Sequence, residues 1–107
     1  MLYTELIISG ETYKLRLNTR NVISLENQLK CNPLAIFGNG DTLPTVTTLV
    51  NILYFSLQQF HHGISLDKTY DLFDTWLAEG HNATEFIPIV LDIYKTSGLI
   101  KGETEKN

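Results

Sequence analysis

Apolar and polar residues alternate near the start of the chain, and the spacing then becomes helical. Tyr13, Leu15 and Leu17 alternate with polar residues, which is the period of two typical of a half-buried strand. A turn-like sequence, SGE, separates them from an earlier apolar run at residues 2–8. The pattern predicts a β-hairpin over residues 2–18. Because an isolated hairpin is marginal in water, its apolar face should lie against the remainder of the chain.

After the hairpin, apolar positions recur at spacings of three and four, which predicts helices. The predicted helices cover residues 20–30, 45–62, 66–79 and 83–97, with a single helical turn at 32–37. Gly63, Gly80 and Gly98 each follow the end of a predicted helix, and Ser65 and Asn82 each open the next one. Such short links force neighbouring helices to pack on each other.

The predicted last helix has a strong start signal and one unusual residue. Asn82 and Glu85 form an N-x-x-E capping box. Pro88 lies past the first turn of that helix, so we expect a local kink or a later start. Residues 99–107 predict a polar C-terminal tail. The remaining residues, 1–98, suit one α+β domain that is mostly α, with the N-terminal β-hairpin followed by a compact bundle of about four helices.

The apolar stripes of the second and third long segments predict which faces are buried. The expected stripe of residues 45–62 comprises Val46, Leu49, Val50, Leu53, Leu57 and Phe60. The expected buried face of residues 66–79 comprises Leu66, Tyr70, Phe73 and Leu77, flanked by Leu72 and Trp76. These stripes predict one continuous core between the helices.

Some apolar residues lie outside these stripes. Ile52 and Phe55 point to the side or the far face of the long helix, and apolar residues cover more than half of the last helix. A helix that is apolar nearly all round is either central in the fold or lies against a partner. We therefore expect a partner-binding surface formed by Ile52 and Phe55 together with Ile87, Leu91 and Tyr94.

Composition and charge narrow the class of function. The chain has 107 residues, of which 43% are hydrophobic, and eight basic against twelve acidic residues give a net charge of −4. This charge argues against a nucleic-acid binder and gives no attraction to an anionic membrane. One cysteine excludes an internal disulfide and fits a reducing compartment. We find no signal peptide and no apolar run long enough to span a bilayer, so a cytosolic location is expected.

Candidate chemistry is sparse. His61 and His62 are consecutive, so on a helix their side chains diverge by about 100° and cannot chelate one ion together. Both are expected in the last turn of the predicted long helix, as part of its termination. Asp67, Asp71 and Asp74 share one face, which a divalent cation could use, but a solvated acidic face is the favoured interpretation. The GNGD sequence lacks the lysine and the preceding strand of a phosphate loop. We expect no catalytic, metal or cofactor site, and no enzyme.

Four segments carry a resemblance to a known family. They are LRLNTRNVISLENQL, NPLAIF, PTVTTLVNILYFSLQQFHHGISLDKTYDLFDTWLAEG and IPIVLDIYKTSG. With these segments the chain resembles a phage tail assembly chaperone from a long-tailed phage or prophage of Gram-positive bacteria, from about Leu15 to Gly98. The likeness lies in helix caps and apolar positions, not in a catalytic signature. Thr47 and Thr48 depart from it, because acidic residues are expected early in that helix.

The resemblance implies a role in tail assembly. Proteins of that family coat the tape measure protein, a very long helical chain that sets tail length, keep it soluble and help to recruit tail tube subunits. The implied partners are the tape measure protein, the major tail tube protein and further copies of the chain, with no cofactor. The implied location is the host cytoplasm, with the protein absent from the mature virion. The alternative is a small structural head–tail connector or tail completion protein that remains in the virion. A DNA-binding regulator ranks lower, because no predicted helix clusters Lys and Arg.

Overall fold

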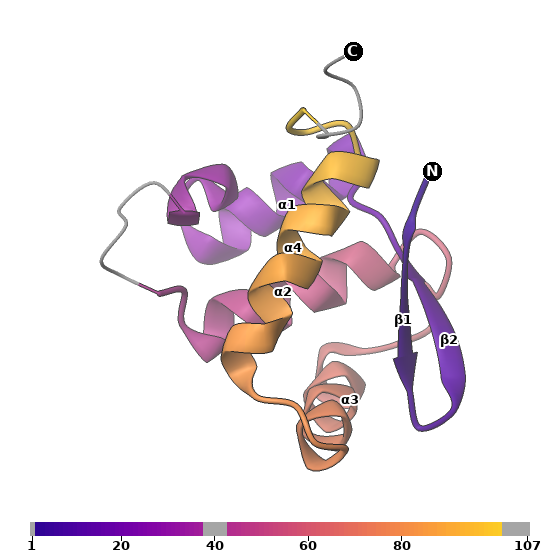
Figure 1. Ribbon diagram of the computed structural model, residues 1–107. Coiled ribbons are helices and arrows are strands. Elements are labelled where there is room, and N and C mark those ends of the chain that lie inside the picture. The colour runs from indigo at the N-terminus through magenta and orange to yellow at the C-terminus, as the bar shows by residue number, and fades with distance from the viewer. Residues whose placement is uncertain (1, 38–42, 102–107) are drawn as a thin grey trace.

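The computed structural model describes residues 2–37 and 43–101, and it shows an N-terminal hairpin followed by four α-helices (Figure 1). The elements are β1 (Thr4–Ile8), β2 (Glu11–Leu15), α1 (Thr19–Leu29), α2 (Val46–Leu57), α3 (Leu66–Ala78) and α4 (Phe86–Thr96), with 3₁₀ segments η1 (Pro33–Phe37) and η2 (Ala83–Glu85). The predicted fold class, α+β and mostly α, is confirmed. In the described part of the chain, no helix is long and apolar enough to cross a membrane. The GNGD sequence, residues 38–41, lies outside the described residues.

The hairpin forms as its alternating pattern predicts. β1 and β2 are antiparallel, and burial alternates along β1, with Thr4, Leu6 and Ile8 turned inward and Glu5 and Ile7 exposed. The connecting turn has two residues with positive φ, 53° and 80°. Positive φ at both central positions is the geometry of a type I′ turn, whose twist matches that of the flanking strands. The second of the two is a glycine, which adopts this conformation without steric cost.

Two sets of hydrogen bonds attach the hairpin to the helices. On the inner face of β1, the Thr4 hydroxyl donates to Asp92 Oδ2 over 2.7 Å and lies 3.1 Å from the Thr96 hydroxyl, both on α4. At the outer edge of β2, the backbone N–H of Arg16 donates to the Ser56 carbonyl over 2.8 Å. The hairpin is therefore fixed to α4 by one strand and to the end of α2 by the other.

Helix α2 is the centre of the fold. It contacts α1, α3, α4 and β2 (Figure 1). Its buried residues are Leu49, Val50, Asn51, Ile52, Leu53, Ser56 and Leu57. The prediction of a single buried stripe beginning at Val46 is therefore wrong, since Val46 is 54% exposed. Val46 lies in the first turn, before the part of the helix that the other elements surround.

Helix α3 is rotated relative to the prediction. Tyr70, expected in the buried face, is 48% exposed. The helix buries Phe73, as predicted, together with Thr69 and the predicted flanking residues Leu72 and Trp76, while Leu66 and Leu77 are half-buried. The rotation follows from an aromatic cluster, because the rings of Phe73 and Trp76 each pack edge-to-face on Phe86 at a centroid distance of 5.5 Å. Large aromatic surfaces dominate such packing, so they fix the face of the helix that turns inward.

The start of α4 confirms the predicted capping box. The Asn82 side chain accepts from the Glu85 backbone N–H, and the Glu85 side chain accepts from the Asn82 backbone N–H. A 3₁₀ turn follows, and α4 begins only at Phe86. Pro88 therefore occupies the first turn of α4, where its missing N–H has no intrahelical acceptor to lose. Of the two predicted outcomes, the later start is the one observed.

The end of the described chain departs from the predicted polar tail. Leu99 and Ile100 are half-buried and pack against the hydrophobic core. The Leu99 backbone N–H also donates to the Tyr94 carbonyl over 2.9 Å. The packed domain therefore extends past residue 98, and the rest of the predicted tail, residues 102–107, lies outside the described residues.

Candidate functional site

Two of the five predicted partner-binding residues belong to the core. Ile52 is 0% exposed and Tyr94 is 1% exposed. The Tyr94 hydroxyl donates to the Pro33 carbonyl over 2.8 Å, and burial raises the pKa of Tyr94 well above its ordinary value. The prediction that these two side chains contribute to a surface is wrong. For Ile52 the cause is the central position of α2, which is covered by other elements on several sides, and Tyr94 lies on the inner face of α4.

The other three predicted residues are half-buried. Phe55 and Ile87 pack against the core while keeping part of their surface, and Leu91 is intermediate in exposure. The Phe55 ring is also in edge-to-face contact with Tyr54, at a centroid distance of 4.8 Å. Ile87 and Leu91 are four residues apart on α4 and therefore share one face. That these residues bind a partner stays a prediction.

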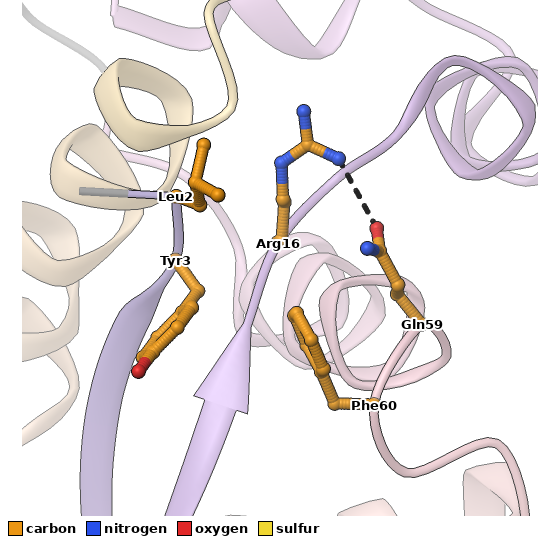
Figure 2. Close-up of a pocket in the computed structure, with 5 residues that line it drawn as sticks. All are labelled: Leu2, Tyr3, Arg16, Gln59 and Phe60. Carbon is orange, nitrogen blue, oxygen red and sulfur yellow. Dashed lines mark hydrogen bonds between the residues drawn. The ribbon is translucent and has the colours of Figure 1, made fainter.

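A more exposed candidate surface lies where the hairpin meets the end of α2 (Figure 2). A groove of about 350 Å³ is lined by Leu2, Tyr3, Arg16, Gln59 and Phe60, and we call it the hairpin groove. Figure 2 shows Leu2 and Tyr3 on one side of Arg16, with Gln59 and Phe60 on the other. The groove therefore joins the residues just before β1, the residue just after β2 and the segment after α2, which come together only in the folded chain.

The aromatic part of the hairpin groove is ordered by its own contacts. The rings of Tyr3 and Phe60 meet edge-to-face at a centroid distance of 5.5 Å. The Lys14 ammonium lies 5.0 Å from the Tyr3 ring centroid and 5.8 Å from that of Phe60. This arrangement is a cation–π contact with two rings. Beside it, Leu2 is 72% exposed, so apolar surface and positive charge occupy the same place.

Arg16 forms the polar part of the groove. Its Nη1 donates to Gln59 Oε1 over 3.2 Å, and the same oxygen accepts from Asn18 Nδ2 over 3.3 Å. Arg16 Nε is buried without an acceptor. No carboxylate within the described ranges lies at ion-pair distance from Arg16 or Lys14. Among the described residues, these two cations therefore have no ion-pair partner, and they lie next to an exposed apolar surface.

A second hollow, of about 510 Å³, lies on α1. Its lining consists of Thr19, Arg20, Ile23 and Ser24. All four residues come from consecutive turns of one helix, so the hollow has no opposing wall from another described element. Ligand sites generally enclose their ligand between elements, and the hairpin groove meets that condition better.

The paired histidines do not lie in the last turn of a helix, contrary to the prediction. Helix α2 ends at Leu57, and the backbone N–H of the next residue, Gln58, donates to the carbonyl three residues before it and not four. The Gln58 side chain donates to the carbonyls of Tyr54 and Ile64. The predicted extension to residue 62 is wrong because this side chain supplies the terminal bonds. His61 and His62 therefore belong to the link between α2 and α3.

His61 has a structural contact that the pattern did not indicate. Its Nε2 accepts from the Lys14 backbone N–H over 3.0 Å, and its ring packs edge-to-face on Tyr13 at 5.3 Å. Accepting a hydrogen bond at Nε2 requires the neutral imidazole. Burial and the Lys14 charge both lower the pKa of His61, which favours that form. His61 thus closes part of the outer edge of β2.

The structure offers little for metal chemistry. Within residues 2–37 and 43–101, no group of three or more His, Cys, Asp or Glu side chains could hold a metal ion. Asp67, Asp71 and Asp74 are exposed on α3, and Cys31 is exposed. The acidic face of α3 therefore faces solvent, in line with the favoured interpretation of its sequence.

Comparisons of the chain with protein-family models, with curated proteins and with solved structures found no match. Inference about function therefore depends on the residues of this chain and their geometry.

The hairpin groove was missed by the sequence patterns. The helical pattern predicts Phe60 in the buried stripe of the long helix, and Tyr3 lies more than fifty positions away from it. The local signal available is the alternation along the second strand, which turns Lys14 and Arg16 to the outer side of the hairpin. That signal places the cations on a surface but does not reveal which aromatic rings lie beside them.

Proposed function

We propose that the protein is a phage tail assembly chaperone that binds and solubilises the tape measure protein during tail morphogenesis. The resemblance over residues 15–98 supports this role. The observation that carries the proposal is the hairpin groove, in which Leu2, Tyr3 and Phe60 expose apolar surface beside a core that is already closed. Exposed apolar surface gathered between elements is typical of a partner-binding site.

The groove suits a long client bound by many copies. Burying apolar surface contributes about 25 cal/mol per Å², and a groove of about 350 Å³ accepts only a few side chains. One copy therefore binds weakly, and coverage comes from many copies along a repetitive helical client. Weak single contacts also allow the chaperone to leave when tail tube subunits arrive.

Helix α4 supplies a second, smaller contact. Ile87 and Leu91 share a half-buried face there, and Phe55 on α2 keeps part of its ring exposed. A client that is bound in the hairpin groove and also passes over Ile87, Leu91 and Phe55 would make this second contact. The net charge of −4 keeps a coated client soluble, because neighbouring copies repel one another.

Co-expression with the tape measure protein of the same gene cluster tests the proposal. With the wild-type chain, we expect the tape measure protein in the soluble fraction and in a complex that copurifies. Phe60→Glu should return it to the pellet, because the substitution places a charge in the apolar groove. Ile7→Glu is the matched control: it changes another exposed apolar residue of the same face but lies outside the groove lining. If the wild-type chain leaves its client in the pellet, the proposed function is wrong.

The protein composition of the virion distinguishes the proposed chaperone from the alternative, a structural protein that remains in the virion. Mass spectrometry of purified phage particles should detect the tail proteins and not this chain, because a chaperone leaves before assembly ends. Finding the chain in stoichiometric amounts in the particles would favour the connector or completion protein instead.

A further inference from the structure

We propose that the hairpin groove recognises an acidic segment of the partner, in which a carboxylate side chain lies next to an aliphatic one. This inference rests on the proposed function and adds the chemistry of the partner segment. Its basis is the charge of Lys14 and Arg16, which no carboxylate of residues 2–37 and 43–101 pairs with, beside the apolar lining of the groove.

The local charge contrasts with that of the whole chain. The chain has twelve acidic and eight basic residues, so a cation should find an acidic neighbour easily. Glu5 is the cross-strand partner of Lys14 in the hairpin register, yet the two side chains form no ion pair. The Lys14 ammonium lies instead over the rings of Tyr3 and Phe60. Its charge therefore stays available to a ligand at the groove.

Arg16 is held in place before any ligand binds. Its hydrogen bond to Gln59 Oε1 fixes one side of the guanidinium, and Asn18 in turn holds Gln59. A guanidinium offers five N–H donors in a rigid fork that matches a carboxylate. Because Arg16 is already restrained, binding costs less side-chain entropy. This preorganisation favours a carboxylate over a neutral polar group.

The apolar lining of the groove determines which kind of partner side chain can lie next to that carboxylate. Leu2 and the rings of Tyr3 and Phe60 provide exposed apolar contact surface beside Arg16. The groove volume of about 350 Å³ is at the small end of ligand pockets. It therefore accepts one or two aliphatic side chains of a partner segment and not a folded domain.

A nucleic acid fits this surface less well. Bases could stack on Tyr3 and Phe60, but a polyanion needs several cations along its backbone. The groove offers only Lys14 and Arg16, on a chain with a net charge of −4. The overall charge repels a long polyanion while two local cations still attract a single carboxylate.

Peptide titrations test the inference without the phage client. The probe is a blocked peptide of Leu, Ala and Glu residues, compared with versions in which Gln or Lys replaces every Glu, and with oligothymidylate. Calorimetry should show the Glu peptide binding most tightly, the Gln peptide roughly tenfold more weakly, and the Lys peptide not at all. Added salt should weaken binding of the Glu peptide.

Charge-matched variants locate the site. Lys14→Gln and Arg16→Gln should each weaken binding of the Glu peptide by roughly tenfold. Lys68→Gln, which removes one exposed positive charge on α3, should bind as the wild-type chain does. Lys14 is itself exposed, so its variant keeps the fold even if the Arg16 variant does not. Backbone amide shifts in NMR spectra should change around the groove in the wild-type chain.

Three results would overturn the inference: equal affinity for the Glu and Gln peptides, equal affinity of the Lys14→Gln and Lys68→Gln variants, or tighter binding of oligothymidylate at the same residues. Client solubilisation is measured separately. A chain that solubilises the tape measure protein but ignores the Glu peptide disproves the acidic partner segment alone. A chain that binds the Glu peptide but fails to solubilise its client disproves the chaperone function alone.

Discussion

Helix α2 and the hairpin carry similar apolar residues but use them in opposite ways. Ile52 on α2 is 0% exposed, whereas Ile7 on β1 is 62% exposed. Four other elements contact α2, while on the outer face of the hairpin the described contacts include those of Phe60, in the segment after α2, with Tyr3 and Lys14. The difference lies in the number of neighbouring elements and not in the side chain. On α2, Val46 in the first turn is the one exposed large apolar residue, whereas Leu2, Ile7 and Phe60 are exposed on the hairpin side.

The largest expected effect contrasts these two isoleucines. Ile52→Ala should lower the free energy of unfolding by roughly 3 kcal/mol, because it leaves a cavity in a closed core. Ile7→Ala, the same substitution on the exposed face, should change it by less than about 1 kcal/mol. Urea denaturation followed by circular dichroism measures both. Similar losses for the two variants would contradict the central position of α2.

A smaller effect compares the two faces of the hairpin. Thr4→Val keeps the shape and strand preference of the side chain but removes the hydroxyl that contacts Asp92 and Thr96. We expect a loss of about 1 kcal/mol in the free energy of unfolding. Thr12→Val, on the exposed face, should change it by less than about 0.5 kcal/mol. A Thr12 variant as unstable as the Thr4 variant would mean that the inner hydroxyl does not hold the hairpin to α4.

The smallest effect concerns pH. The pKa of His61 is lowered in the folded chain from its ordinary value of 6.5, so the unfolded chain takes up this proton first. Stability from neutral His61 is therefore complete above pH 6.5 and is lost as the pH falls below it toward the lowered folded pKa. His61→Gln should flatten this part of the stability profile, measured by urea denaturation across pH 5 to 8.

His62→Gln is the control for the pH experiment. His62 is exposed and, among the described residues, makes no hydrogen bond with the hairpin. Its replacement removes an imidazole from the same link without touching the Lys14 contact. If both variants flatten the profile equally, the bond between His61 and Lys14 is not the source of the pH dependence.

Local signals in the sequence predicted the elements well. The hairpin, the cap of α3 at Ser65 and the capping box at Asn82 were each predicted from a few adjacent residues. The physical reason is that turns and caps depend on bonds within about four residues. Such bonds are fixed by the neighbouring sequence, whatever the remainder of the chain does.

The faces of the helices were harder to predict. The helical pattern predicts Tyr70 and Val46 in buried stripes, but they are exposed, and it predicts Ile52 on a surface, but it is buried. Helical periodicity gives the angle between side chains but not the number of elements around the helix. When a helix is surrounded, as α2 is, periodicity contains no information about an outer face.

The hairpin groove depends on contacts that are distant in the sequence. Tyr3 and Phe60 meet because β2 binds the end of α2 through Arg16 and Ser56. No spacing rule links these positions, because the contact follows from how the hairpin packs. A surface that combines residues from three segments becomes visible only in the folded chain.

The bonds at Lys14 and Arg16 also limit how copies of this protein can associate through their backbones. A sheet can grow from molecule to molecule only if each molecule has two strand edges with unpaired backbone groups. One edge pairs with the molecule before it and the other with the molecule after it. Here the N–H groups of Lys14 and Arg16 are already bonded to His61 and Ser56. A molecule whose β2 edge is bonded at these two positions is a poor template for the next strand of such a sheet. This protects a small chain with apolar strands against fibre formation when it is made in large amounts.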